Sequence, residues 1–269
     1  MKKGKLVGRG MTSEVYKWGN DKVLKLFYNR ISEEWIKQEA RIGIAVHDAG
    51  VPSPEVFELA DVDGRKGIIF QRISGSTVLM HFIAEPWNIN HYAKRLADLQ
   101  FNIHQLSADN LPSQKEKFEY RINASADILG DKKPFILDYL KSLPDGNCIC
   151  HGDLHYNNII ISGNDWIPID WTNAYQGNPL GDVARTYLMM TSPAKPPGIP
   201  DLVMMPVQYV KWLSYKSYMN EYLKLSQGIP EDIDAWILPV AAAKLRDSMP
   251  GEQRWLMDII DRNLKQLGN

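Results

Sequence analysis

Two motifs lie close together in the chain, His151-Gly152-Asp153-Leu154-His155-Tyr156-Asn157-Asn158 and Ile169-Asp170-Trp171. Between them, residues 159–168 run from an apolar stretch through a turn cluster to a second apolar stretch, which predicts a tight β-hairpin. Because a hairpin returns the chain on itself, Asp153 and Asn158 before it are expected to face Asp170 after it. Two carboxylates and a carboxamide at one point form a hard-oxygen site suited to Mg²⁺ and a phosphate-bearing substrate. The alternative is that Asp153 and Asn158 are turn residues and that His151 is a hydrogen-bonded core histidine.

The overall composition is ordinary for a soluble globular protein. The chain has 269 residues, 44% of them hydrophobic and 23% charged, which is enough for one large domain or two modest ones. A net charge of -1 provides no long-range field to attract nucleic acid or an anionic membrane. No apolar run approaches the roughly 20 residues that span a bilayer, and no apolar segment typical of signal peptides follows the basic start. We therefore expect a cytoplasmic protein that binds neither nucleic acid nor a membrane.

The only two cysteines are Cys148 and Cys150. They lie too close for a disulfide to be expected, and the alternation of a strand would point them to opposite faces. The sequence offers no second cysteine pair for a zinc site. We interpret both as reduced thiols of a cytoplasmic protein, with a redox role as the alternative.

The first part of the chain is predicted to be a β-sheet with one helix. Ser32, followed by Glu33 and Glu34, has the pattern of a helix start, and the helix should end at Gly50. Asp63-Gly64 is a strong hairpin turn signal. Strands are predicted, in chain order, at residues 5–8, 14–18, 22–28, 55–62 and 67–73.

Helical periodicity dominates after residues 74–77, which we interpret as a hinge between two domains. Residues 90–106 carry the most regular apolar stripe. The proline-rich segment 192–200 is predicted to be an irregular loop. The other predicted helices cover residues 115–129, 134–143, 183–190, 202–226, 231–247 and 251–266.

A glycine-containing loop with Gly8, Gly10 and Ser13 lies between the first two predicted strands. The Rossmann and Walker arrangements are excluded, because both need such a loop to open a helix. A glycine-containing hairpin can instead fold its backbone N–H groups over phosphates. The alternative is that the glycines only shape a turn.

Lys25 stands in the middle of an apolar strand, where a lysine usually occupies the solvent face. A glutamate of the following helix would instead hold it inside the site. Glu39 is the best placed, with Glu34 and Glu33 behind it. Such a pair would direct the ammonium at phosphate oxygens.

These parts follow a recognisable order: glycine loop, strand lysine, helix glutamate, hinge, Asp-x-x-x-x-Asn and a final Asp. The order resembles the protein kinase-like fold. The motif of residues 151–158, followed by Ile169-Asp170-Trp171, resembles the aminoglycoside phosphotransferase and choline kinase-like family. The resemblance covers about residues 4–190. It implies an α+β, bilobal fold with a small antiparallel sheet lobe of residues 1–74, which carries one helix, and a larger, mainly helical lobe of residues 75–269.

The resemblance also implies roles for the residues of the two motifs. Asp153 would accept the proton of the acceptor hydroxyl or orient that hydroxyl, and Asn158 and Asp170 would hold Mg²⁺. Gly152 stands where eukaryotic protein kinases have an arginine, and Ile169-Asp170-Trp171 replaces their Asp-Phe-Gly. Both differences favour a small-molecule kinase with no activation loop to be phosphorylated.

The same resemblance places ATP at the first lobe. Lys25 would contact the phosphates and Glu39 would fix Lys25. Backbone groups of Gln71 and Ile73 would bind adenine at the hinge. Ser13 departs from the kinase pattern, because it stands where the third glycine of that loop would fall.

The function implied is ATP-dependent O-phosphotransfer to the hydroxyl of a small molecule, with ATP and Mg²⁺ as cofactors and no obligate protein partner. An atypical protein kinase and a nucleotide-binding pseudokinase are the alternatives. Residues 201–269 carry acids and bases in similar numbers, so the sequence does not identify the acceptor. Aromatic residues there could enclose a choline-like ammonium but are better explained as core.

Three further polar residues have predicted places. His104 is expected to be a packed or hydrogen-bonded residue of its helix. His155 is a candidate for lining the acceptor site, because its loop faces the cleft in the resembled fold. Asp182 is predicted to be a helix cap or a brace for the catalytic loop.

Overall fold

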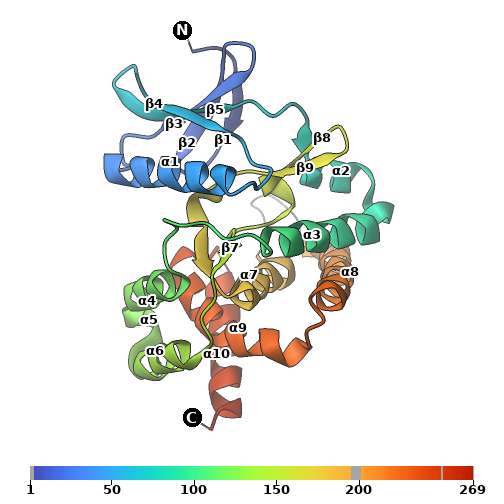
Figure 1. The fold of residues 1–269 in the computed structure, drawn as a ribbon. Coiled ribbons are helices and arrows are strands. Elements are labelled where there is room, and N and C mark those ends of the chain that lie inside the picture. Colours follow the sequence, from blue (N-terminus) through green and yellow to red (C-terminus); the bar gives the residue numbers. More distant parts are fainter. Residues whose placement is uncertain (1–2, 195–200, 250, 269) are drawn as a thin grey trace.

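The computed structural model describes residues 3–194, 201–249 and 251–268. Figure 1 shows an antiparallel sheet with helix α1 at one end of the molecule and a larger bundle of helices at the other. This is the bilobal α+β fold that the sequence predicts. The sheet has the strand order β1-β2-β3-β5-β4, with every neighbouring pair antiparallel. Its strands are β1 (Leu6–Arg9), β2 (Ser13–Trp18), β3 (Lys22–Phe27), β4 (Val56–Val62) and β5 (Arg65–Gln71).

Helix α1 (Glu33–Asp48) covers one face of this sheet. It begins as predicted, because the Ser32 hydroxyl accepts a hydrogen bond from the backbone N–H of Trp35. Ile36 and Ala40 on its inner side form a buried cluster with Phe27 and Ile68 of the central strands. The packing fixes which side chains of α1 face the sheet and which face the second lobe.

The chain leaves the sheet through a close backbone contact at Gly75. A Cβ atom here would lie 1.9 Å from the carbonyl oxygen of Ile161, so only glycine fits. The contact lets β6 (Ser76–Thr77) pair with β8 (Ile159–Ser162), which also pairs with β9 (Asp165–Pro168). The predicted hairpin of residues 159–168 is confirmed, with Ile160 opposite Ile167. A separate pair, β7 (Cys148–Cys150) and β10 (Tyr175–Gly177), lies next to it in the chain.

Helices form most of the second lobe. The largest buried cluster of the molecule lies here and includes Leu96, Ile122, Tyr175 and Trp236. Helix α3 packs along α8, and α9 packs against α7 and α10. The helices are α2 (Val78–Ala84), α3 (Ile89–Ile103), α4 (Gln114–Ala124), α5 (Ala126–Leu129), α6 (Lys133–Ser142), α7 (Pro179–Thr191), α8 (Asp201–Ser226), α9 (Pro230–Lys244) and α10 (Glu252–Gln266). Short 3-10 turns lie at Pro86–Asn88, Gly130–Lys132, Tyr156–Asn158, Trp171–Asn173 and Leu245–Asp247.

Several predicted helices need correction. The single helix predicted at 115–129 is broken at Ser125, whose hydroxyl donates to the carbonyl of Arg121 while its backbone leaves the helical region. The helix predicted to begin at Val183 begins at Pro179, because Asn178 caps it by accepting from the N–H of Leu180. The residues of the predicted hinge form the short strand β6, and α2 follows where no helix was expected.

Two other predictions concern the ends of segments. The helix predicted at 231–247 ends at Lys244 and continues as a 3-10 turn. The predicted loop 192–200 falls largely outside the described residues. Among the residues that the structure describes, no helix combines the length and the apolar character that a membrane span needs.

Candidate active site

The loop that the sequence predicts to be catalytic, called the catalytic loop below, runs from His151 to Asn158, between β7 and β8. Its anchor is Asp182, a fully buried carboxylate on the first turn of α7. Asp182 accepts hydrogen bonds from the backbone N–H groups of His151 (3.1 Å) and Gly152 (2.7 Å). Of the two roles predicted for Asp182, the brace is therefore confirmed, while the helix cap is Asn178.

The carboxylate of Asp182 is saturated with donors. Gln100 and the ring of His104 also donate to it, at 2.9 and 3.1 Å. Burial works to raise the pKa of Asp182, but the hydrogen bonds and charge of His104, with Gln100, outweigh it and lower that pKa to about 2. Cys150 lies near enough to suggest a metal cluster with His104 and Asp182. The four donors around Asp182 explain the cluster as a hydrogen-bond network instead.

The side chain of His151 fixes the shape of the loop. Its Nε2 donates to the carbonyl of Ile169 (3.1 Å), and its Nδ1 accepts from the backbone N–H of Asp153 (3.2 Å). One donor and one acceptor correspond to a neutral ring. Burial lowers the pKa of His151, in agreement with that form.

Gly152 must be glycine for two reasons. Its φ is 74°, and a Cβ atom would lie 2.3 Å from the carbonyl oxygen of Asn173. Its own carbonyl accepts from the guanidinium of Arg185, which also lies 3.7 Å from Oδ1 of Asp153. Asp182 and Arg185 stand three residues apart on α7, so one face of that helix holds both ends of the Gly152 peptide.

The hairpin brings the metal candidates together. The carboxamide nitrogen of Asn158 donates to the backbone carbonyl of Asp153 (3.0 Å) and lies 3.4 Å from its carboxylate. The backbone carbonyl of Asn158 accepts from Ile169, the residue before Asp170. Asp170 itself has a left-handed backbone, with φ 63° and ψ 61°, a conformation that aspartate tolerates better than most residues.

Lys25 joins the two lobes. Its ammonium lies 2.6 Å from Oε1 of Glu39 and 3.0 Å from Oδ1 of Asp170, so it faces the site and not solvent. Glu33 and Glu34 pair elsewhere, with Lys37 and Arg41. Burial works to lower the pKa of Lys25, but the two carboxylates outweigh it and raise that pKa. The lysine in turn, with the Thr172 hydroxyl, holds the pKa of Asp170 below its ordinary value against the effect of burial.

The donor set fits Mg²⁺. Asn158 commits its carboxamide nitrogen to Asp153, which leaves its oxygen as the ligand atom. Asp170 receives Lys25 and the Thr172 hydroxyl on Oδ1, so Oδ2 is the atom that would be left for an ion. Carboxylate and amide oxygens are the ligands that Mg²⁺ takes, together with substrate phosphates and water.

The glycine loop closes the site from the first lobe. Gly10 and Ser13 line the cleft, and the N–H of Gly10 donates to the carbonyl of Ser13 (2.9 Å). Neither Gly8 nor Gly10 has a positive φ, and an added Cβ would meet its neighbours at 3.7 and 3.8 Å. These are ordinary contacts, so the turn itself does not require glycine at either position.

Of the two hinge candidates, Gln71 is the last residue of strand β5 and Ile73 lies two residues beyond it. The backbone N–H of Gln71 donates to the carbonyl of Glu55 (2.8 Å), and the backbone N–H of Glu55 donates to the side-chain oxygen of Gln71. The N–H of Gln71 is therefore already used within the sheet. Ile73 follows in the half-buried connection to β6.

A cleft of about 1860 Å³ extends from this site along the second lobe. Asp153, Asp170 and His155 line it. The Nδ1 of His155 accepts from the N–H of Asn157, and its Nε2 lies 3.8 Å from Oδ2 of Asp153. Its lining also includes apolar residues of α2, α7 and α8, namely Leu79, Phe82, Ile83, Met190, Val207 and Val210.

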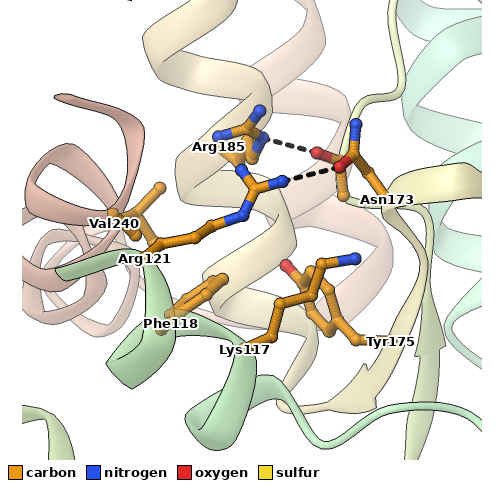
Figure 2. Close-up of a pocket in the computed structure, with 9 residues that line it drawn as sticks. Lys117, Phe118, Arg121, Asn173, Tyr175, Arg185 and Val240 are labelled. Carbon is orange, nitrogen blue, oxygen red and sulfur yellow. Dashed lines mark hydrogen bonds between the residues drawn. The ribbon is translucent and has the colours of Figure 1, made fainter. Parts of the chain in front are cut away.

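Three basic residues beneath the catalytic loop were not predicted from the sequence. Figure 2 shows Lys117, Arg121 and Arg185 around one small cavity with Tyr175 and Asn173. Lys117 and Arg121 are four residues apart on α4 and so share a face. That spacing was visible in the sequence, but nothing local indicated that this face meets the loop.

Comparisons with known proteins give the same fold. A thermostable mutant of the aminoglycoside phosphotransferase APH(4)-Ia, solved with AMP-PNP and hygromycin B, is 16% identical, with a TM-score of 0.64 over 96% of this chain and 91% of that one. APH(2")-IIa, solved with streptomycin and ATP, is 16% identical, with a TM-score of 0.54 over 90% of this chain and 81% of that one. APH(3'')-Id from Streptomyces rimosus is 14% identical, with a TM-score of 0.55 over 86% of this chain and 89% of that one.

At such low identity these structures show the fold alone. No curated protein sequence matches the chain. The phosphotransferase enzyme family matches residues 3–203, which include the glycine loop, Lys25, the catalytic loop and Asp170. With its fold and this match over most of its length, the chain belongs to the phosphotransferase enzyme family.

Proposed function

We propose that this protein transfers the γ-phosphoryl group of Mg²⁺·ATP to the hydroxyl of a small molecule. One observation carries the proposal above others: Lys25 of the first lobe binds both Glu39 and Asp170, and Asp170 lies beside the loop of Asp153. Phosphoryl transfer needs positioned charges more than covalent chemistry. A lysine, a carboxylate for the hydroxyl and oxygen ligands for Mg²⁺ are the parts it requires.

Asp153 is the acceptor-side residue in this mechanism. Its carboxylate accepts a hydrogen bond from the substrate hydroxyl and takes the proton as the new P–O bond forms. The neutral ring of His151 and the amide of Asn158 hold its backbone and orient it. His155 adds a donor near the same carboxylate.

The nucleotide side is assigned to the first lobe. Lys25, fixed by Glu39, neutralises phosphate oxygens, and the loop with Gly8, Gly10 and Ser13 covers them. Asn158 and Asp170 would hold Mg²⁺, which would supply positive charge to neutralise the phosphate oxygens.

The adenine end belongs to the connection between the lobes. Ile73 supplies the backbone donor there, since the N–H of Gln71 is used by Glu55. In this proposal residues 1–74 act as the nucleotide lobe and residues 75–269 as the catalytic and acceptor lobe.

The acceptor class proposed is a small alcohol. Hygromycin B and streptomycin occupy two of the similar structures, which supports a small molecule over a protein as acceptor. We also place the reaction in the cytoplasm, which supplies ATP and keeps thiols such as Cys148 and Cys150 reduced.

The test is an ATP-consumption screen over small alcohols with the variant Asp153→Asn. The amide keeps the size of the side chain but cannot take a proton, so kcat should fall about 10³-fold while Mg²⁺·ATP binding persists. Asp165→Asn, at an exposed position of the hairpin, is the control and should keep wild-type turnover. Turnover of Asp153→Asn within a few fold of wild type would overturn the assignment.

A further inference from the structure

Three cations gather beneath the catalytic loop from two helices. Lys117 and Arg121 come from α4, and Arg185 comes from α7 (Figure 2). Arg121 donates to the Asn173 side chain (2.7 Å), and Arg185 lies 3.7 Å from Oδ1 of Asp153. We call these three residues the basic cluster. All three also line the large cleft, so the cluster is open to the acceptor side.

The basic cluster carries more positive charge than its neighbours neutralise. Arg121 pairs with Asp247 (3.0 Å), and Arg185 with Asp153. Lys117 has no carboxylate of a described residue within ion-pair distance; it donates to the backbone carbonyls of Thr172 (3.5 Å) and Ala174 (3.3 Å). A half-buried ammonium held only by carbonyls is unusual, because desolvating a charge is unfavourable unless an opposite charge compensates it.

The charge state of Lys117 reflects this position. Burial, and then repulsion from Arg121 and Arg185, lower its pKa to about 7. An anion bound against Lys117 would oppose both effects. The side chain is thus poised to gain a counter-ion that the described residues do not supply.

A second observation points to a ligand in the same place. The basic cluster lines one side of a cavity of about 10 Å³, which Phe118, Val240 and Ala243 also line and which has room for about one water-sized oxygen. The hydroxyl of Tyr175, a residue only 1% exposed, has no hydrogen-bond partner among the described residues, and Tyr175 lines the same cavity (Figure 2). An oxygen atom there would accept from Tyr175 and from the cationic donors together.

Bracing the loop accounts for part of this arrangement but not for all of it. Arg185 holds the Gly152 carbonyl, and Arg121 holds Asn173. Neither contact involves Lys117 or the Tyr175 hydroxyl. What remains is a lysine and a hydroxyl for which the described residues supply no counter-ion and no hydrogen-bond partner, next to an oxygen-sized space that adjoins the cleft beside Asp153.

We propose that the acceptor carries an anionic oxygen group, a carboxylate or a phosphate ester, and that the basic cluster binds this group while Asp153 binds the acceptor hydroxyl. The inference rests on the function proposed above and names its substrate class. Arg121 and Arg185 suit such groups because guanidinium forks match carboxylate and phosphate oxygens. Because Arg185 belongs to the basic cluster and also lies 3.7 Å from the carboxylate of Asp153, the hydroxyl and the anion are expected to be only a few bonds apart in the acceptor.

The same cluster disfavours a polycation. An aminoglycoside brings several ammonium groups, and placing one beside Lys117, Arg121 and Arg185 would be repulsive. The acceptor would therefore differ in charge from hygromycin B and streptomycin, which occupy the similar structures.

The experiment is a calorimetric titration of the protein saturated with Mg²⁺·AMP-PNP, so that nucleotide phosphates already fill their own site. The probes are four compounds of matched size: glycerate, glycerol phosphate, glycerol and 2-amino-1,3-propanediol. We expect glycerate or glycerol phosphate to bind at least about tenfold more tightly than the neutral and cationic probes, a difference that one charge-assisted contact supplies. Comparing the affinities of glycerate and glycerol phosphate shows whether the site prefers a carboxylate or a phosphate ester.

Two variants complete the test. Lys117→Met should lower the affinity of the preferred anion about tenfold. Lys141→Met, at an exposed lysine of α6 that does not line the cleft, should leave it unchanged. Arg121→Gln provides a second reading if Lys117→Met does not fold.

The outcomes separate this inference from the proposed function. Equal or tighter binding of glycerol or the amine, no binding of either anion, or an unaltered anion affinity in both cluster variants would overturn the anionic acceptor. Weaker AMP-PNP binding in the variants, with anion affinity preserved, would assign the cluster to the nucleotide and also overturn it. Failure of the proposed function would be seen in the ATP-consumption screen instead: with every alcohol tested, ATP consumption would be independent of Asp153.

Discussion

At the scale of single residues, Gly10 is not required by the fold but is expected to matter for phosphate binding. Its backbone is ordinary, and an alanine Cβ would meet only the carbonyl of Ser13 at 3.8 Å. Glycine at such a position loses conformational freedom on folding without a local reason. What the loop gains is a bare backbone facing the cleft where phosphates are proposed to bind.

Gly10→Ala should therefore keep or slightly raise the free energy of unfolding, by up to about 1 kcal/mol, because alanine restricts the unfolded chain. Its Kd for Mg²⁺·ATP should rise several-fold, since the added methyl group stands between the backbone and the phosphates. Urea denaturation and nucleotide titration measure the two effects.

Gly64→Ala is the matched control and should behave in the opposite way. Gly64 has φ 73° in the turn between β4 and β5, far along the chain from the glycine loop. Alanine there should lose about 1 kcal/mol of stability through backbone strain and leave ATP binding unchanged. A wild-type Kd for Gly10→Ala would show that the loop does not approach the phosphates.

At the scale of elements, the first turn of α7 anchors the catalytic loop through a single carboxylate. The pKa of Asp182 is lowered to about 2 from an ordinary value of 3.8. A carboxyl whose pKa is depressed by folding adds stability above its unfolded pKa, and this stability is lost as the pH falls through the folded pKa. The shift corresponds to about 2 kcal/mol.

Asp182→Asn should destabilise the protein by about 3 kcal/mol at pH 7, because an amide cannot accept from all the donors that surround this carboxylate. The gap in unfolding free energy between wild type and variant should be constant down to about pH 5 and narrow as the pH falls toward 2. Urea titrations at pH 7, 5, 4 and 3 measure it. Asp165→Asn, exposed on the hairpin, controls for general effects of charge. A gap that stays constant to pH 3 would contradict the anchoring role.

The elements also show how far sequence can lead. The hairpin of residues 159–168 and helix α1 were predictable because their signals are local: alternation, a turn cluster and the Ser32 cap. The break at Ser125 was not, since a serine within a helical pattern gives no sign of whether its hydroxyl will donate back to the preceding turn. Helix α2 was missed for the opposite reason, because its seven residues are too few for periodicity to emerge.

The residues of the candidate site also differ in whether local sequence signals predict them. Asp153, Asn158 and Asp170 were accessible from sequence because one hairpin joins them. Lys25 and Glu39 were accessible through the order of a resembled fold. The basic cluster was not, because Lys117 on α4 and Arg185 on α7 meet only after the second lobe has packed. Contacts that arise from tertiary packing leave no local pattern to read.

At the scale of the whole molecule, the proposed ATP site lies across both lobes. The ion pair between Lys25 and Asp170 links the N-terminal sheet to the segment after β9. A ligand that binds residues of both lobes should stabilise them as one unit, because it binds the folded protein and not the unfolded chain. The response to nucleotide therefore reports on the complete site and not on one lobe.

Mg²⁺·ATP at about 100 times its Kd should add about 2.7 kcal/mol and raise Tm by about 5 °C. ATP with EDTA should give a much smaller shift. Asp170→Asn should lose the Mg²⁺-dependent part of the shift while folding normally, because asparagine tolerates the left-handed backbone of position 170 as well as aspartate does. Asp138→Asn, at an exposed carboxylate of α6, should respond like wild type. Equal Tm shifts with Mg²⁺·ATP and with ATP plus EDTA in the wild type would contradict the assignment of Asp170 as a metal ligand. A wild-type Mg²⁺-dependent Tm shift in Asp170→Asn would contradict it as well.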